Sequence, residues 1–338
     1  MVTVARVALI GLGAIGREVL IALDGVASVQ VVAVVDPAPA LVGRDAGQIV
    51  GLSPLGVSVV AGAAEALALA EADVALVLTG SGVADLLPVV EAAAAAGVDV
   101  VSSCEDLALA AWGTPELARR IDALAVSGGI TVLGTGVNPG FVMDRLPLQL
   151  AGACVRVKGI RVERVVDAAK RRGPLRAKVG ADLTPEEFAA GVAARRLGHR
   201  GLPESCALIG VGLGLPFDEV RTTIEAVIAT SAAPRAGIVP GRVAGLRQSA
   251  IGLRAGRVIA RLDLEMSVDA PDPHDRIWID GDPPLDVRIA GGTHGDRGTV
   301  GTIINAIPAV IAAAPGLKTV LDLPLYGVLG GAEDASAP

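Results

Sequence analysis

Residues 4–23 read VARVALIGLGAIGREVLIAL and are the strongest indication of the fold of the first domain. An apolar run ends at Gly11, and Gly11, Gly13 and Gly16 form a Gly-x-Gly-x-x-Gly pattern that leads straight into a helical sequence. In a dinucleotide-binding unit the first glycine permits a tight turn, the second lets the pyrophosphate approach the backbone, and the third lets the helix pack on the strand. The free N–H groups at the start of the helix would bind the phosphates. The pattern therefore predicts a dinucleotide-binding domain.

A second apolar run, residues 29–35, ends at Asp36, about 20 residues after the glycines. This context matters because 43 glycines make a chance match to the glycine pattern easy. An acidic side chain at this point accepts hydrogen bonds from a ribose 2′-hydroxyl and repels a 2′-phosphate. We expect NAD(P)H as the cofactor, with NAD favoured by Asp36 unless Arg44 compensates for the negative charge. The alternative is that Asp36 is only a turn residue before Pro37.

Composition excludes several classes of protein. The chain is 52% hydrophobic, which excludes disorder, yet charges, Gly or Pro interrupt every apolar stretch before the roughly 20 residues of a membrane-spanning helix. A net charge of −7 spread along the chain argues against a nucleic-acid surface. We predict a soluble, cytoplasmic protein without a signal peptide. Neither a disulfide framework nor a metal site is indicated by the scattered residues Cys104, Cys154, Cys206, His199, His274 and His294.

Apolar strands and alanine-rich helices alternate through roughly the first 140 residues, which predicts an α/β domain with a doubly wound parallel sheet. We expect strands at 73–78, 98–101 and 130–133 and a helix at 88–96. Such sheets bind ligands just beyond the carboxyl ends of their strands. There Asn138 is a candidate donor to the cofactor or substrate, or a turn residue before Pro139. The expected cofactor-binding residues are Gly11, Leu12, Gly13, Ala14, Ile15, Gly16, Asp36, Thr79, Gly80, Ser81, Ser103, Cys104, Asn138 and Asn305.

A second, α+β domain begins near residue 143, where strand-like alternation appears at 159–166 and 258–266. Thr184, Pro185 and Glu187 predict a helix start with a capping box. We expect the dinucleotide-binding domain to span 1–142, with a helical segment from 299 to 307 and the following chain to 330 packing back on it. The expected substrate and dimerisation domain spans 143–298.

Glu105 follows a strand that should end at the cofactor crevice, so it is the best candidate for moving protons beside a nicotinamide. An equally good interpretation is that Glu105 is a first-turn acid that stabilises a helix at 106–110. Cys104 suggests the thiolate of an aldehyde dehydrogenase, but no neighbour in the sequence would lower its pKa. A packing role for Cys104 is therefore the favoured interpretation.

Four further blocks resemble the native amine dehydrogenases and the related 2,4-diaminopentanoate dehydrogenases. They are GTGVNPGFVMD at 134–144, RVVDAAKRR at 164–172, GHRGLPES at 198–205 and GGTHGD at 291–296. The resemblance implies a Rossmann domain, a second domain of dihydrodipicolinate reductase type, and reductive amination of a small carbonyl compound by ammonia. Together with the long, largely apolar strands of the second domain, it also implies a homodimer built through that domain.

The family's catalytic glutamate lies in a Ser-Ser-Cys-Glu-Glu-Leu block, which matches residues 102–107 and assigns the role to Glu105. Relatives carry an aromatic-Pro-Trp sequence soon afterwards, whereas this chain reads ALAAW at 108–112, so one pocket wall is expected to be smaller or shifted. Phe141, Arg164 and Lys170 are the candidate pocket residues. The paired histidines and the Lys-x-Asp-x-Pro-Ser-Gly-Thr block of dihydrodipicolinate reductases are missing from the sequence, which excludes that activity.

Three hypotheses follow. The first is an amine dehydrogenase for carbonyl compounds that lack a carboxylate. The second is a 2,4-diaminopentanoate dehydrogenase, for which Arg164 or Lys170 should present a cation to the substrate carboxylate. The third is a non-catalytic NAD(P)-binding regulator, which a solvent-facing Glu105 would support.

Overall fold

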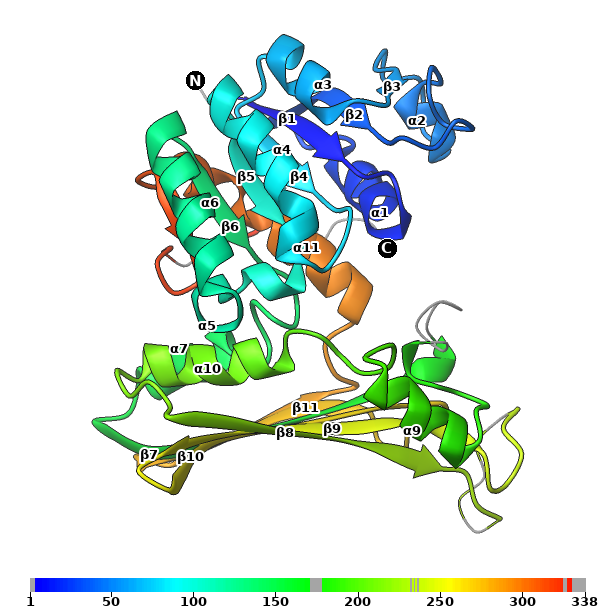
Figure 1. Ribbon diagram of the computed structural model, residues 1–338, viewed down its shortest axis with the longest axis vertical. Coiled ribbons are helices and arrows are strands. Elements are labelled where there is room, and N and C mark those ends of the chain that lie inside the picture. The colour runs from blue at the N-terminus through cyan, green and yellow to red at the C-terminus, as the bar shows by residue number, and fades with distance from the viewer. Residues whose placement is uncertain are drawn as a thin grey trace, which may run out of the picture. The chain divides into compact units, whose positions relative to one another are not determined.

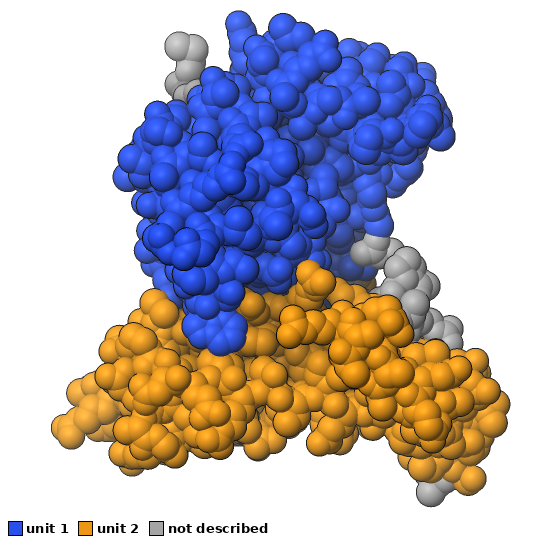
Figure 2. Space-filling model, viewed as in Figure 1, with its two compact units in different colours: residues 1–141, 295–338 blue, residues 142–294 orange. Residues whose placement is uncertain are grey.

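The computed structural model describes residues 4–170, 178–231, 233, 235, 237–324 and 327–329 of the chain (Figure 1). The chain divides into two compact units. The first comprises Met1–Phe141 and Gly295–Pro338, and the second is Val142–His294 (Figure 2). None of the described helices is both long and apolar enough to cross a membrane.

The first unit is built on a parallel sheet with the strand order β13-β6-β5-β4-β1-β2-β3. Its strands are β1 (Ala5–Ile10), β2 (Val29–Val35), β3 (Val59–Val60), β4 (Val74–Val77), β5 (Asp99–Ser102), β6 (Thr131–Gly134) and β13 (Gly316–Lys318). The chain runs outward from β1 to β3, returns to β4 on the other side of β1, and continues outward again. This reversal is the switch point at which doubly wound sheets bind ligands. The predicted fold class is confirmed.

Helices cover both faces of this sheet (Figure 1). One face packs against α3 (Ala63–Ala70), α4 (Val83–Ala96) and α6 (Pro115–Gly128). The other packs against α1 (Ala14–Leu23) and α11 (Gly295–Ile311). Successive strand residues point to opposite faces, so most strand residues are apolar, as expected for a sheet buried on both sides.

Two helix starts differ from the sequence prediction. Helix α4 begins at Val83 rather than at Pro88, because Val83 and Leu86 are buried and their packing outweighs the backbone hydrogen bond that Pro88 cannot make. It ends at Gly97, whose φ of 68° is the left-handed conformation that glycine adopts without strain. Helix α11 begins at Gly295, four residues before the predicted start.

The second unit is built on a six-stranded sheet with the order β12-β11-β7-β10-β9-β8, in which β7 and β10 are parallel and the other pairs are antiparallel. Its strands are β7 (Arg156–Asp167), β8 (Glu219–Ile228), β9 (Val243–Arg254), β10 (Arg257–Ser267), β11 (His274–Asp282) and β12 (Leu285–Ala290). Helices α7 (Arg145–Ala151), α9 (Pro185–Ala193) and α10 (Leu202–Gly212) pack on one face. The capping box of Thr184 and Glu187 is confirmed at the start of α9.

The strands of this second sheet are apolar on one face only. Ile160, Val162, Leu262, Leu264 and Ile277 point to the face that the helices cover, and all are buried. The opposite face, which we call the charged face, carries ion pairs between Arg161, Glu163, Arg261, Asp263, Arg276 and Asp286. On it the Trp278 ring lies between the Arg161 and Arg276 guanidinium groups, at 4.8 and 4.6 Å. The expectation of largely apolar strands is wrong for this face.

Candidate functional site

The glycine turn between β1 and α1 contains glycines of two kinds. Gly11 has a φ of +98°, and a Cβ built on Gly16 would lie 1.9 Å from the Gly11 carbonyl oxygen, so the chain's own packing requires both. By contrast, no described atom lies within 4 Å of a Cβ built on Gly13. The fold itself does not require glycine at this position. The open space suits a pyrophosphate that approaches the backbone, so the residues present fit a dinucleotide.

Asp36 is held by backbone N–H groups at the end of β2. Leu12 N donates to Asp36 Oδ2 at 2.8 Å, and Ala38 N donates to Oδ1 at 2.9 Å. The carboxylate is therefore bound to the glycine turn itself. Each oxygen keeps a lone pair that a ribose hydroxyl can use. Arg44 is exposed, and its Nη1 lies 3.4 Å from the Ala40 carbonyl oxygen.

Glu105 is half-buried and is the first residue of a 3₁₀ turn, Glu105–Leu107, directly after β5. Glu105 is thus also a first-turn acid, as the alternative expected, but the helix is a single 3₁₀ turn and not a segment at 106–110, since the next helix is α5 (Ala110–Gly113). The neighbouring segment after β4 carries Thr79 and Gly80, which are exposed, and Ser81, which is partly buried. The carboxyl ends of adjacent parallel strands thus place Glu105 and the 79–81 loop at one edge of the sheet.

Hydrogen bonds fix the backbone on both sides of Glu105. Ser102 Oγ donates to the Val77 carbonyl at 2.9 Å and accepts from Cys104 N at 3.1 Å. The Ser81 carbonyl accepts from Cys104 Sγ at 3.1 Å and from Asp106 N at 3.2 Å. Ser102 was not among the residues predicted for the site. Its position as the last residue of a buried strand was the available signal.

Cys104 is not a nucleophile. Burial raises the pKa of its thiol to about 12, so the thiolate is absent at neutral pH. The favoured packing role of this cysteine agrees with its burial.

The loop after β6 is buried from Thr135 to Gly140 and contains a cis peptide bond between Asn138 and Pro139. Asn138 is 8% exposed. Val137 N donates to Thr299 Oγ1 of α11 at 3.3 Å, so this helix helps to hold the loop. Phe141, in the same loop, is half-buried.

Asn305, also on α11, accepts a hydrogen bond from Leu329 N through Oδ1 at 2.8 Å. Its side-chain oxygen therefore holds the chain's own C-terminal segment. The proposed contact with a cofactor would use its side-chain amide nitrogen, or the second lone pair of the oxygen.

In the second unit, Arg164 is buried beside a carboxylate. Its Nη1 lies 2.6 Å from Asp275 Oδ1, and the two side chains are 4% and 0% exposed. Arg164 Nη2 donates to the Thr293 carbonyl at 2.8 Å, and Thr293 N donates to Asp275 Oδ2 at 2.6 Å. Arg164 thus carries a neutralised charge and fixes the segment that ends at His294. The side chain of Lys170 lies outside the described part of the chain.

A second buried cluster joins α7 to α10. Ser205 Oγ donates to Asp144 Oδ2 at 2.7 Å, and Arg145 N donates to Asp144 Oδ1 at 2.6 Å. Asp144 and Ser205 are both fully buried. They end the first and third blocks of the resemblance, but their pairing was not visible in the sequence because 61 residues separate them.

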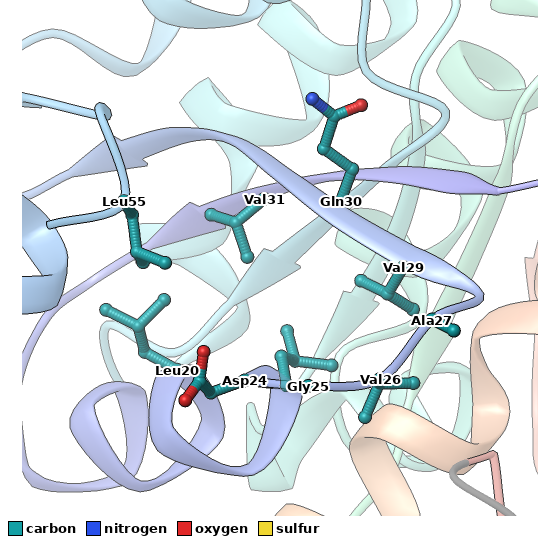
Figure 3. A pocket seen from close by; sticks show the side chains of 10 residues that line it. Leu20, Asp24, Gly25, Val26, Ala27, Val29, Gln30, Val31 and Leu55 are labelled. Carbon is teal, nitrogen blue, oxygen red and sulfur yellow. The ribbon is translucent and has the colours of Figure 1, made fainter. Parts of the chain in front are cut away.

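A pocket of about 370 Å³ in the first unit lies away from this edge of the sheet. Figure 3 shows that its side chains come from the end of α1, the loop that follows and the start of β2, with Leu55 added from the segment before β3. The start of β2 is at the amino edge of the parallel sheet, opposite Asp36. The pocket is therefore not the predicted cofactor site. It is lined by Leu20, Leu23, Asp24, Gly25, Val26, Ala27, Val29, Gln30, Val31 and Leu55.

Comparison with protein families gives two matches. Residues 5–104 match the N-terminal domain of dihydrodipicolinate reductase, and residues 141–336 match the C-terminal domain of 2,4-diaminopentanoate dehydrogenase. The chain belongs to the 2,4-diaminopentanoate dehydrogenase family. The resemblance seen in the sequence blocks is confirmed, and membership of this dehydrogenase family makes the chain an oxidoreductase.

Individual members of the family cover most of the chain. A 2,4-diaminopentanoate dehydrogenase from Acetoanaerobium sticklandii is 31% identical over 268 residues, which are 77% of this chain and 76% of the relative. An amine dehydrogenase from Streptomyces virginiae is 26% identical and covers 95% of this chain and 96% of its own. The solved structure of an amine dehydrogenase from Mycobacterium smegmatis has a TM-score of 0.83 at 28% identity, covering 96% of this chain and 97% of its own.

Proposed function

We propose that the chain is an NAD(P)H-dependent amine dehydrogenase that aminates ketones or aldehydes with ammonia and, in reverse, deaminates primary amines. The observation that carries the proposal is the position of Glu105. It lies on a fixed turn at the carboxyl edge of a Rossmann sheet, beside the strand ends where such sheets bind their cofactor. Relatives over most of the chain's length are named amine dehydrogenase and 2,4-diaminopentanoate dehydrogenase.

The cofactor would be held by the glycine turn and by Asp36. Gly13 leaves room for the pyrophosphate, and the first N–H groups of α1 would bind it. Asp36, already fixed by Leu12 N and Ala38 N, would accept from the ribose hydroxyls and disfavour a 2′-phosphate, so NAD is the preferred cofactor. When bound, the nicotinamide supplies the hydride.

Glu105 would manage the protons of the reaction. As a carboxylate it removes a proton from ammonium, so that ammonia can add to the carbonyl carbon. It then returns a proton to the hydroxyl of the carbinolamine, which leaves as water, and its negative charge stabilises the resulting iminium ion. Because the turn is fixed, the carboxylate needs little reorientation during these steps, which lowers the entropic cost of the reaction.

The ion pair of Arg164 favours substrates without a carboxylate. A substrate carboxylate would need a cation whose charge is available, whereas Arg164 is already paired with buried Asp275. Phe141 stays the proposed apolar wall. The second candidate function, oxidation of 2,4-diaminopentanoate, is favoured by the relative with 31% identity, and would need a different cation such as Lys170.

A rate assay separates these functions. Purified protein is given NADH and a panel of ketones and aldehydes, with and without ammonium, and in the reverse direction NAD with simple amines or with 2,4-diaminopentanoate. We expect oxidation of NADH that depends on ammonium and is fastest with carbonyl compounds that lack a carboxylate. Turnover independent of ammonium would identify a carbonyl reductase, and NADH binding without any turnover would favour the regulator.

The homodimer and the cytoplasmic location stay predictions. A twofold dimer through the open face of the second unit's sheet would use a surface that is charged rather than apolar. Light scattering at micromolar concentration should give twice the mass of one chain. The mass of a single chain would contradict the dimer.

A further inference from the structure

Gly134, the last residue of β6, lies against the turn that carries Glu105. A Cβ built on Gly134 would be 2.7 Å from the Leu107 carbonyl carbon, 2.8 Å from Ala108 N and 2.8 Å from Leu107 Cβ. Two of these three atoms belong to the backbone, so they cannot move aside as a flexible side chain does. Glycine is therefore required here by close approach and not by an unusual φ.

One hydrogen bond links the atoms that Gly134 contacts to Glu105. Ala108 N, which the added Cβ would push, donates to the carbonyl oxygen of Glu105 at 3.3 Å. The turn is attached on its other side, because the Ser81 carbonyl accepts from Asp106 N and Cys104 Sγ. Strand β6 cannot retreat either, since it pairs with β5 on one side and β13 on the other.

We propose that Gly134 is a positioning residue for amine dehydrogenation, which sets the place of the Glu105 carboxylate by letting its turn pack on the end of β6. The inference rests on the proposed role of Glu105. An ordinary contact distance of 3.4 Å would require the turn to move by about 0.7 Å relative to Gly134. Displacements of about 1 Å at a reacting group cost on the order of 10²-fold in rate.

The chain offers a matched control in the same unit. A Cβ built on Gly128, at the end of α6, would lie 2.7 Å from Ala94 O and 2.8 Å from both Ala94 Cα and Cβ. The clash is equally severe and also involves backbone atoms. Gly128 precedes β6, so it lies toward the amino edge of the sheet, away from Glu105. Gly128→Ala should therefore cost stability without moving the carboxylate.

The experiment measures kcat, KM for carbonyl and ammonium, the NADH dissociation constant, melting temperature and the pH profile of kcat/KM for Gly134→Ala and Gly128→Ala. We expect both variants to melt earlier. We expect Gly134→Ala alone to lose about 10-fold or more in kcat and to show an altered pH profile, with NADH binding unchanged. Equal kcat in the two variants, whether both fall or neither does, would overturn the inference.

If Gly134→Ala does not fold, a second pair of variants tests whether the packing of the Glu105 turn affects kcat. Ser102→Ala removes the acceptor of Cys104 N, which precedes Glu105, while Thr131→Val removes a buried hydroxyl at the amino end of β6. Ser102→Ala should lower kcat and Thr131→Val should not, and equal kcat values would overturn the inference.

Glu105→Gln separates the inference about Gly134 from the proposed function of Glu105. If it retains the parent kcat, the proposed function of Glu105 fails together with the inference. If Glu105→Gln is inactive while Gly134→Ala is fully active, only the inference fails.

Discussion

The two units hold their polar groups in different ways. At the carboxyl edge of the first unit's sheet the partners are backbone atoms, since Asp36 accepts from Leu12 N and Ala38 N, and Cys104 donates to the Ser81 carbonyl. In the second unit many of the charged groups are paired with other charged side chains. Arg164 pairs with Asp275 inside the unit, and similar pairs cover its charged face.

This difference separates function from stability. A backbone partner remains in place when a side chain is changed, so substitutions at the carboxyl edge of the parallel sheet should alter chemistry and leave the frame intact. A charged partner is left alone when its pair is removed, so substitutions in the second unit should act on stability. Substitutions in the two units test this contrast.

The largest effect is expected at Arg164. Arg164→Met leaves the Asp275 carboxylate buried without its cation, which should lower the free energy of unfolding by about 3–5 kcal/mol. Denaturant titration measures this change. The double variant Arg164→Met with Asp275→Leu should recover much of it, because no buried charge remains. A loss below about 1 kcal/mol for the single variant would contradict the contrast.

The next effect concerns turnover. Glu105→Gln keeps size and polarity but removes the base and the negative charge, so kcat should fall by on the order of 10²-fold or more, about 2.7 kcal/mol. Melting temperature and NADH binding should not change. Glu116→Gln, the same substitution at an exposed ion pair on α6, serves as the control. Unchanged turnover in Glu105→Gln would reduce Glu105 to a structural acid.

The contrast between backbone partners and charged side-chain partners also explains which features could be predicted from the sequence. Gly11, Gly16 and Asp36 lie within one strand-turn-helix-strand unit, and their partners are backbone groups that any sequence supplies, so a local pattern predicts them. Glu105 was found because it directly follows a buried strand. Local order along the chain thus predicted the parallel sheet and its functional edge.

The parts that escaped prediction depend on distant partners. Asp275 lies 111 residues from Arg164, and nothing local in either strand indicates the pairing. The charged face, by contrast, had a local signal, because the alternation at 159–166 and 258–266 puts charged residues on one side of these strands. Gly134 resembles any other glycine until the turn that lies against it is known.

A smaller effect is expected at Asp36. Asp36→Asn removes the charge that binds ribose hydroxyls and repels a 2′-phosphate, so NADH should bind about 10-fold more weakly and the preference over NADPH should shrink. Fluorescence titration with both cofactors gives the ratio. A parent enzyme that already prefers NADPH would show that the assignment of Asp36 is wrong.

The smallest effect is expected on the charged face. Burial raises the pKa of Asp263, but hydrogen bonds from Arg261 and Ser249 outweigh it and leave the pKa below its ordinary value of 3.8. A lowered folded-state pKa means that the stabilisation is present above pH 3.8 and is lost as the pH falls through the folded value. Asp263→Asn should therefore cost at most about 1 kcal/mol at neutral pH. Melting curves of parent and variant should converge in acid, and a constant difference would contradict the ion-pair explanation.

The tryptophans offer a separate optical signal for each unit. The chain contains two of them, Trp112 in the first unit, 43% exposed, and Trp278 between two guanidinium groups in the second. With Trp112→Phe or Trp278→Phe, the remaining indole emits from one unit alone. The two single-tryptophan proteins would show whether both units unfold in one cooperative transition or melt one after the other.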